Sequence, residues 1–157
     1  MSDPDYKLLN SQLCALLVEE TDALASASNF VALMVNAMND INWLGIYVLR
    51  GDELVLGPFQ GKPACVHLHV GKGVCGTAAA TLQTQRIADV HKFEGHIACD
   101  ADSRSELVVP LLINGKLIGV LDIDSPTPDR FTQADQAGIE KLCASFCELQ
   151  SSRDKFI

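Results

Sequence analysis

The sequence predicts an α+β fold in which a central antiparallel β-sheet is flanked by N- and C-terminal helices. Apolar residues recur at helical spacing near both ends of the chain, whereas two β-hairpins lie between them. Strands and helices do not alternate regularly, which argues against a parallel sheet. Because no linker, repeat or low-complexity stretch interrupts the 157 residues, we expect one domain over residues 1–157.

Two helices are expected before the sheet and one after it. Helical spacing is seen at Leu9, Leu13, Leu16 and Leu17, and again at Val31, Met34, Val35 and Met38. We place the break between the first two helices near Ala25–Ser28. Thr132 and Asp135 predict a capping box that opens the last helix. The expected core face of that helix carries Ile139, Leu142, Cys143 and Phe146.

The two hairpins form most of the predicted sheet. Trp43–Leu49 and Glu53–Phe59 are apolar and β-prone, and a turn at Arg50-Gly51-Asp52 separates them. Leu107–Ile113 and Lys116–Ile123 flank Asn114-Gly115, the strongest short hairpin signal in the chain. The elements expected between the hairpins are a strand at Val66–Val70, a short helix at Val74–Gln83, a strand at Arg86–Val90 and an irregular loop from His91 to about Ser105.

Composition excludes several classes of partner. The chain has 20 acidic and 12 basic residues and no basic run, so nucleic acid and anionic membranes are poor candidates. No apolar run approaches the roughly 20 residues of a membrane span. The acidic, polar start Met1–Asp5 is unlike a secretory signal. We therefore expect a cytoplasmic protein whose six cysteines lie in a reducing compartment.

Three of the cysteines are expected to be structural. Cys143 and Cys147 lie one turn apart on the apolar face of the last helix, and Cys14 lies beside Leu13 and Leu17. Free cysteine usually behaves as a small buried apolar residue. These three thiols are therefore not expected to take part in chemistry.

The other three cysteines are candidates for thiol redox chemistry. Cys65 precedes a strand, Cys75 lies among glycines, and Cys99 lies in the irregular loop. Groups near Cys99 that would favour its thiolate are His91, His96 and Arg104. A nucleophilic Cys99 would need a resolving thiol, and both Cys65 and Cys75 are candidates for it.

Other readings of the same residues are weaker. Gly71–Gly76 formally matches the dinucleotide pattern GxGxxG, but no further βαβ units follow, so a tight turn is expected there. Potential metal donors are His67, His69, His91 and His96 with the three loop cysteines, but no CxxC or HxxxH pair is present. We expect neither a metal nor a cofactor. A Cys–His protease would leave the spare cysteines unexplained.

An acidic and an aromatic group complete the candidate site. Asp122 and Asp124 share one face of a strand, and counting back through the Asn114-Gly115 turn brings Glu106 beside them. Three converging carboxylates repel one another, so at least one should hold its proton near neutral pH, and the group also suits an ammonium ligand. Trp43 and Tyr47 share a face of the first strand, either as core or as an aromatic box.

The loop and strand motifs resemble those of a known family. The matching segments are Ala64-Cys65, Gly73–Ala79, Asp89–His91, Gly95–Asp100, Ser103–Glu106 and Leu121–Asp124. They resemble the free methionine-(R)-sulfoxide reductases, which are single-domain enzymes with the GAF fold. The resemblance runs from about Tyr6 to Gln150, and the GHIACD…SRSE segment is long and specific.

The resemblance implies roles for individual residues. It makes Cys99 the nucleophile, Cys65 the resolving cysteine and Cys75 an auxiliary thiol. The residues it implies around the substrate are Trp43, Tyr47, Glu106, Asp122 and Asp124. It also implies a pocket under a loop and a homodimer packed through helices.

The resulting hypothesis is reduction of free L-methionine (R)-sulfoxide to methionine. Cys99 becomes a sulfenic acid, Cys65 converts it to a disulfide, and a thioredoxin-type dithiol recycles the protein. Glu106 is the favoured proton donor. The alternative is a GAF sensor module that binds a small ligand. A sensor does not need three loop thiols, and we expect a sensor module to be followed by an output domain, for which this chain has no room.

Overall fold

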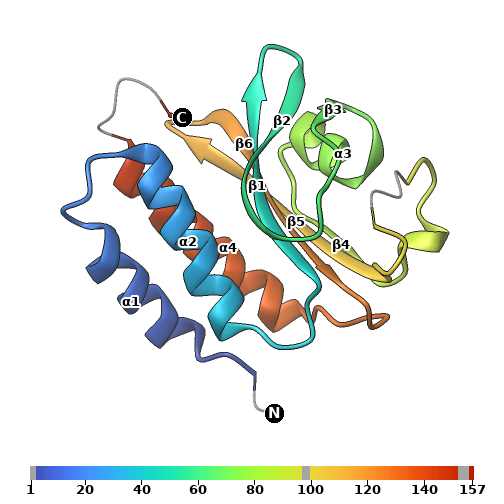
Figure 1. The fold of residues 1–157 in the computed structure, drawn as a ribbon, viewed down its shortest axis with the longest axis horizontal. Coiled ribbons are helices and arrows are strands. Elements are labelled where there is room, and N and C mark those ends of the chain that lie inside the picture. Colours follow the sequence, from blue (N-terminus) through green and yellow to red (C-terminus); the bar gives the residue numbers. More distant parts are fainter. Residues whose placement is uncertain (1–2, 97–99, 152–155) are drawn as a thin grey trace.

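The computed structural model describes residues 3–96, 100–151 and 156–157. Within these ranges an antiparallel sheet has the strand order β3-β2-β1-β6-β5-β4 (Figure 1). The strands are β1 (Trp43–Arg50), β2 (Glu53–Gly61), β3 (His67–His69), β4 (Gln85–Ile87), β5 (Ser105–Ile113) and β6 (Lys116–Ser125). The helices are α1 (Tyr6–Leu17), α2 (Ala23–Ala37), α3 (Gly73–Thr81) and α4 (Gln133–Gln150), with a 3₁₀ turn at Val90–Lys92. The predicted α+β class is confirmed.

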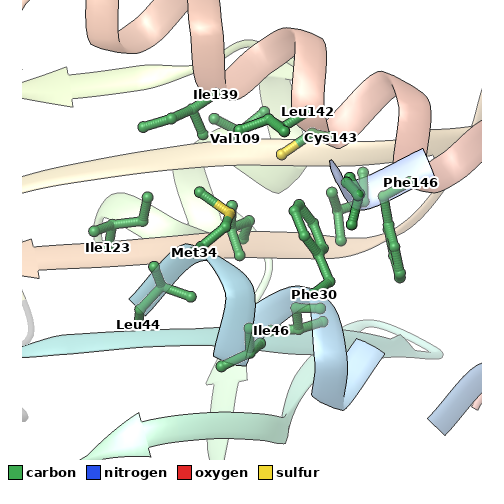
Figure 2. Close-up of a cluster of buried hydrophobic side chains, with 14 of the residues drawn as sticks. Phe30, Met34, Leu44, Ile46, Val109, Ile123, Ile139, Leu142, Cys143 and Phe146 are labelled. Carbon is green, nitrogen blue, oxygen red and sulfur yellow. The ribbon is translucent and has the colours of Figure 1, made fainter. Parts of the chain in front are cut away.

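The helices divide between the two faces of the sheet. Figure 1 shows α1, α2 and α4 together on one side and α3 on the other. On the first side the side chains of α2 and α4 interleave with those of β1, β5 and β6, and the rings of Phe30 and Phe146 stack at 4.7 Å (Figure 2). Cys143 and Cys147 are buried free thiols in this core, as predicted. Cys14 is only half-buried.

Capping residues explain where α2 and α4 begin. The predicted box opens α4: Thr132 accepts a hydrogen bond from the backbone of Asp135, and Asp135 accepts one from Thr132. The predicted break near Ala25–Ser28 is wrong, because those residues lie inside α2. Asp22 starts that helix by accepting a hydrogen bond from the backbone N–H of Ala25 at 2.8 Å.

The segment between α3 and β5 also differs from the expectation. The strand predicted at Arg86–Val90 is shorter, because β4 ends at Ile87 and Val90 begins the 3₁₀ turn. Asp89 stabilises that turn by accepting a hydrogen bond from the backbone N–H of His91 at 3.0 Å.

None of the helices in the described ranges is long and apolar enough to cross a membrane.

The strand register decides which side chains face α3. Trp43 on β1 pairs with Asp124 on β6, and Glu106 on β5 pairs with the same Asp124. Because side chains two residues apart share a face, Tyr47 and Asp122 point the same way. A second apolar cluster, which includes Trp43 and Tyr47, fills this side together with α3.

Candidate active site

A cavity lies on the α3 side of the sheet, bounded by β1, β5 and β6, by the start of α3 and by the segments before and after it. Its volume is about 50 Å³, which is room for a few water molecules and so indicates a small ligand. Its walls include Trp43, Tyr47, Lys62, Ala64, Cys75, His96, Asp100, Ser103, Glu106, Asp122 and Asp124.

The three predicted carboxylates meet in this cavity. Glu106 and Asp122 are each only 6% exposed, and both reach the cavity with Asp124. The hairpin turn at Asn114-Gly115 sets this convergence, because it fixes Glu106 opposite Asp124 in the register. Asn114 adopts the left-handed conformation that such a turn requires (φ 51°).

Burial and mutual repulsion keep protons on this cluster. Burial, and then the charges of Asp122 and Asp124, raise the pKa of Glu106 well above its usual range. Burial, followed by Asp122 and Asp100, does the same to the pKa of Asp124. Burial also raises the pKa of Asp122, but interactions with Glu106 and Cys75 that favour its charged form oppose the rise. The charged form is therefore most favoured at Asp122, and the proton at Glu106 or Asp124.

The two aromatic residues form a wall of the cavity. The rings of Trp43 and Tyr47 stack with their centroids 5.8 Å apart, and those of Trp43 and Phe59 stack with their centroids 5.3 Å apart. The indole N–H of Trp43 donates to the carbonyl of Lys62 at 3.1 Å, and the hydroxyl of Tyr47 donates to the carbonyl of Cys65 at 2.9 Å. Both rings therefore pack in the core and also fix the segment that carries Cys65.

The three candidate cysteines have different environments. Cys75 is a buried free thiol in α3, and its pKa is raised by burial and by the charges of the carboxylates. Cys65 is disulfide-bonded, unlike Cys75. Cys99, the predicted nucleophile, lies outside the described residues.

The glycine-rich run before α3 has a structural explanation. Gly71 and Gly73 adopt positive φ angles of 91° and 68°, which favour glycine. The backbone N–H of Gly71 donates to the carbonyl of Gly76 at 2.8 Å. A side chain at Gly76 would collide with the carbonyl of His69. The run is therefore a tight entry into α3, as expected.

The cavity residues that were not predicted as part of the substrate site include Lys62, His96, Asp100 and Ser103. His96 Nε2 lies 3.8 Å from Glu106 Oε2, and burial lowers the pKa of His96, so this is a contact of a neutral imidazole. Asn42 donates to both Asp100 and Ser103 at 3.1 Å. The position of His96, Asp100 and Ser103 in the same motif as Cys99 was the sequence signal for them.

The cavity also holds one group of potential metal ligands. The Sγ of Cys75 and carboxylate oxygens of Glu106 and Asp122 all lie within 4.8 Å of one another. None of the four histidines considered as metal donors in the sequence belongs to this group. The donor set therefore differs from the histidine-rich one that the sequence offered.

Comparison with known proteins agrees with this geometry. The GAF domain family matches residues 6–149. The chain is 52% identical over 149 residues to free methionine-R-sulfoxide reductase of Escherichia coli K12. The alignment covers 95% of this chain and 90% of the relative.

Solved structures show the same fold. The substrate complex of fRMsr of Staphylococcus aureus has a TM-score of 0.90 and 48% identity, covering 95% of this chain and 97% of that chain. Free methionine-R-sulfoxide reductase of Neisseria meningitidis with its substrate has a TM-score of 0.88 and 38% identity, covering 92% and 87%. The chain therefore belongs to the free methionine-R-sulfoxide reductase family, within the larger family of GAF domains.

Proposed function

We propose that this protein reduces free L-methionine (R)-sulfoxide to L-methionine. The observation that carries the proposal is the meeting of three carboxylates, of which Glu106 and Asp122 are buried, and an aromatic wall in one small cavity. The relatives named free methionine-R-sulfoxide reductase supply the substrate and its stereochemistry.

The cavity chemistry suits a free amino acid. An ionised carboxylate accepts charge-assisted hydrogen bonds from an α-ammonium group, and Asp122 is the member of the cluster whose charged form is most favoured. The rings of Trp43 and Tyr47 offer apolar surface to a methionine side chain and its sulfur. These residues are therefore the proposed binding groups, with Asp124 beside them.

In the proposed reaction the Cys99 thiolate attacks the sulfoxide sulfur. Glu106 gives its proton to the departing oxygen, which the raised pKa of Glu106 favours. The protonated oxygen passes to Cys99 Sγ as its bond to the substrate sulfur breaks, and the sulfur–sulfur bond formed by the attack breaks as well. Methionine therefore leaves with two electrons gained, and Cys99, which supplied them, becomes a sulfenic acid.

The remaining steps restore the thiols. Cys65 attacks the sulfenic sulfur, water leaves, and a Cys65–Cys99 disulfide forms. The resolving role of Cys65 is supported by its disulfide-bonded state in the structure. A thioredoxin-type dithiol then reduces this disulfide and becomes oxidised itself. Cys75, which lines the cavity, is an auxiliary thiol in this scheme.

The proposed setting is a cytoplasmic homodimer. A reducing compartment agrees with the free thiols at Cys14, Cys75, Cys143 and Cys147. Exposed leucines on the first two helices, Leu8, Leu16 and Leu24, support pairing through helices. Sedimentation of the wild type against the Leu8→Ser/Leu16→Ser variant tests the dimer.

Substrate form is the sharpest test of the function. The purified protein is incubated with a dithiol and either free or N-acetylated methionine (R)-sulfoxide, and methionine formation is followed by amino-acid analysis. Loss of the ammonium should lower kcat/KM by roughly two to three orders of magnitude, because a charge-assisted hydrogen bond is lost and a buried carboxylate is left unpaired. Equal rates on the two substrates would contradict the proposed binding mode.

A further inference from the structure

Cys75, Glu106 and Asp122 form a compact donor set in the wall of the cavity. One sulfur and two carboxylate groups from α3, β5 and β6 lie within 4.8 Å of one another, and all three residues are buried. Zn²⁺ accepts both cysteine sulfur and carboxylate oxygen as ligands, and catalytic zinc sites use three protein ligands with a fourth position left open. The geometry therefore suits one ion.

A second observation at the same place points to a ligand. Asp122 Oδ1 is buried and has no hydrogen-bond partner among the described residues, and Asp122 lines the cavity. A buried oxygen without a partner destabilises the folded protein, and more so when the oxygen is charged. A cation that enters the cavity would remove this penalty.

The sulfur distinguishes a metal ion from the ammonium of an amino acid. An ammonium group uses oxygen acceptors and gains little from a thiol, whereas thiolate ligands select soft ions. We propose that Cys75, Glu106 and Asp122 bind a thiophilic divalent cation, Zn²⁺ or Cd²⁺, inside the cavity. His96 lies at the edge of this site, with Nε2 3.8 Å from Glu106 Oε2.

This ion would inhibit the reaction rather than assist it. It would occupy the carboxylates that hold the substrate ammonium and the proton in the proposed function. Ion and amino acid therefore compete, and this competition, unlike the metal site itself, rests on the proposed function.

Cadmium binding tests the site directly, because a cadmium–thiolate bond absorbs in the ultraviolet. The full chain is used as the Cys65→Ser/Cys99→Ser variant, which removes the two other candidate thiols. We expect about one Cd²⁺ per chain with a thiolate band. Adding Cys75→Ser should abolish the band and weaken binding by about a hundredfold or more, since even the loss of a supporting contact costs 10–100-fold.

Two further variants complete the test. Asp122→Asn should weaken Cd²⁺ binding by about tenfold or more while the band from Cys75 remains. Cys14→Ser, which removes a half-buried thiol outside the cavity, should leave both affinity and band unchanged. A band that survives Cys75→Ser, or that disappears with Cys14→Ser, would overturn the proposal, as would the absence of Cd²⁺ binding.

Competition separates this proposal from the proposed function. Free L-methionine should weaken Cd²⁺ binding more than an equal concentration of L-alanine, which has the same chelating amino and carboxylate groups, when the ion and L-methionine share the cavity. Cd²⁺ binding that depends on Cys75 but ignores L-methionine would leave the metal site standing and would contradict the proposed amino-acid site.

Discussion

Glu106 on β5 and Asp124 on β6 lie directly opposite each other in the antiparallel register, with Asp122 two residues away on the same face of β6. Like charges in opposite positions destabilise a sheet. All three carboxyl groups are nevertheless placed in the cavity, where burial raises their pKa values. The arrangement lowers stability and keeps a proton available in the site.

Stability should therefore fall as pH rises. The folded cluster holds protons that the unfolded chain releases near pH 4, so the free energy of unfolding decreases as pH increases from about 4 toward the raised pKa values. Glu106→Gln should raise stability by about 1–2 kcal/mol at neutral pH and by little near pH 4. Urea unfolding across pH measures this. Glu19→Gln, at an exposed position, is the control, and a pH slope unchanged by Glu106→Gln would contradict the expectation.

The cysteine variants should separate the chemical steps. Cys99→Ser should abolish methionine formation, because a hydroxyl does not ionise in the range of a thiol. Cys65→Ser should retain one stoichiometric round but lose cycling with a thioredoxin-type dithiol. Single-turnover and steady-state assays measure the two effects. Cys143→Ala should keep full turnover while losing about 1–2 kcal/mol of stability, since it only empties space in the core.

Amide variants should identify the proton donor. Glu106→Gln should lose the first step, in which Cys99 is oxidised. It should also change the alkaline limb of the pH–activity profile, because Glu106 has a raised pKa and loses its proton on that side. Asp122→Asn should mainly raise KM, because it weakens ammonium binding. Methionine release in a single turnover, followed across pH, checks both. A full-rate burst from Glu106→Gln would move the donor role to Asp124.

Gly45 should control the position of the aromatic wall. A Cβ at this residue would lie 2.5 Å from Trp43 Cη2 and from the Cβ of Phe59. Gly45→Ala should therefore displace the indole, cost about 1–3 kcal/mol of stability and raise KM more than it lowers kcat. Because Trp43 is the only tryptophan, its fluorescence reports the displacement. An unchanged spectrum together with an unchanged KM would argue against Trp43 as a binding group.

Asp135 should show the opposite pH dependence to the cavity carboxylates. Burial alone would raise its pKa, but hydrogen bonds from Thr132 and Tyr6 and the charge of Arg130 lower it. The stability from Asp135 is therefore present above the ordinary aspartate pKa and is lost as pH falls through the lowered value. Asp135→Asn should cost about 3 kcal/mol at neutral pH in urea unfolding. Asp129→Asn, an exposed position with φ 52° that asparagine tolerates, should change stability by less than about 0.5 kcal/mol.

Local sequence rules predicted the part of the site that one hairpin builds. A strand repeats every two residues, and a two-residue turn fixes its register, so Asn114-Gly115 brings Glu106 beside the two aspartates. The same alternation placed Trp43 and Tyr47 on one face. The capping box of α4 could likewise be predicted from the sequence, because its two residues are only three positions apart.

Tertiary packing alone decided the rest. That Cys75 joins Glu106 and Asp122 follows from how α3 packs on β5 and β6, and no local period encodes a contact between segments so far apart. The break before α2 was misplaced because a single capping aspartate, Asp22, outweighed the small and polar residues that follow it. Burial, which raises the pKa values of the carboxylates, is a property of the assembled sheet, helix and loops, since water is excluded only when all of them are in place.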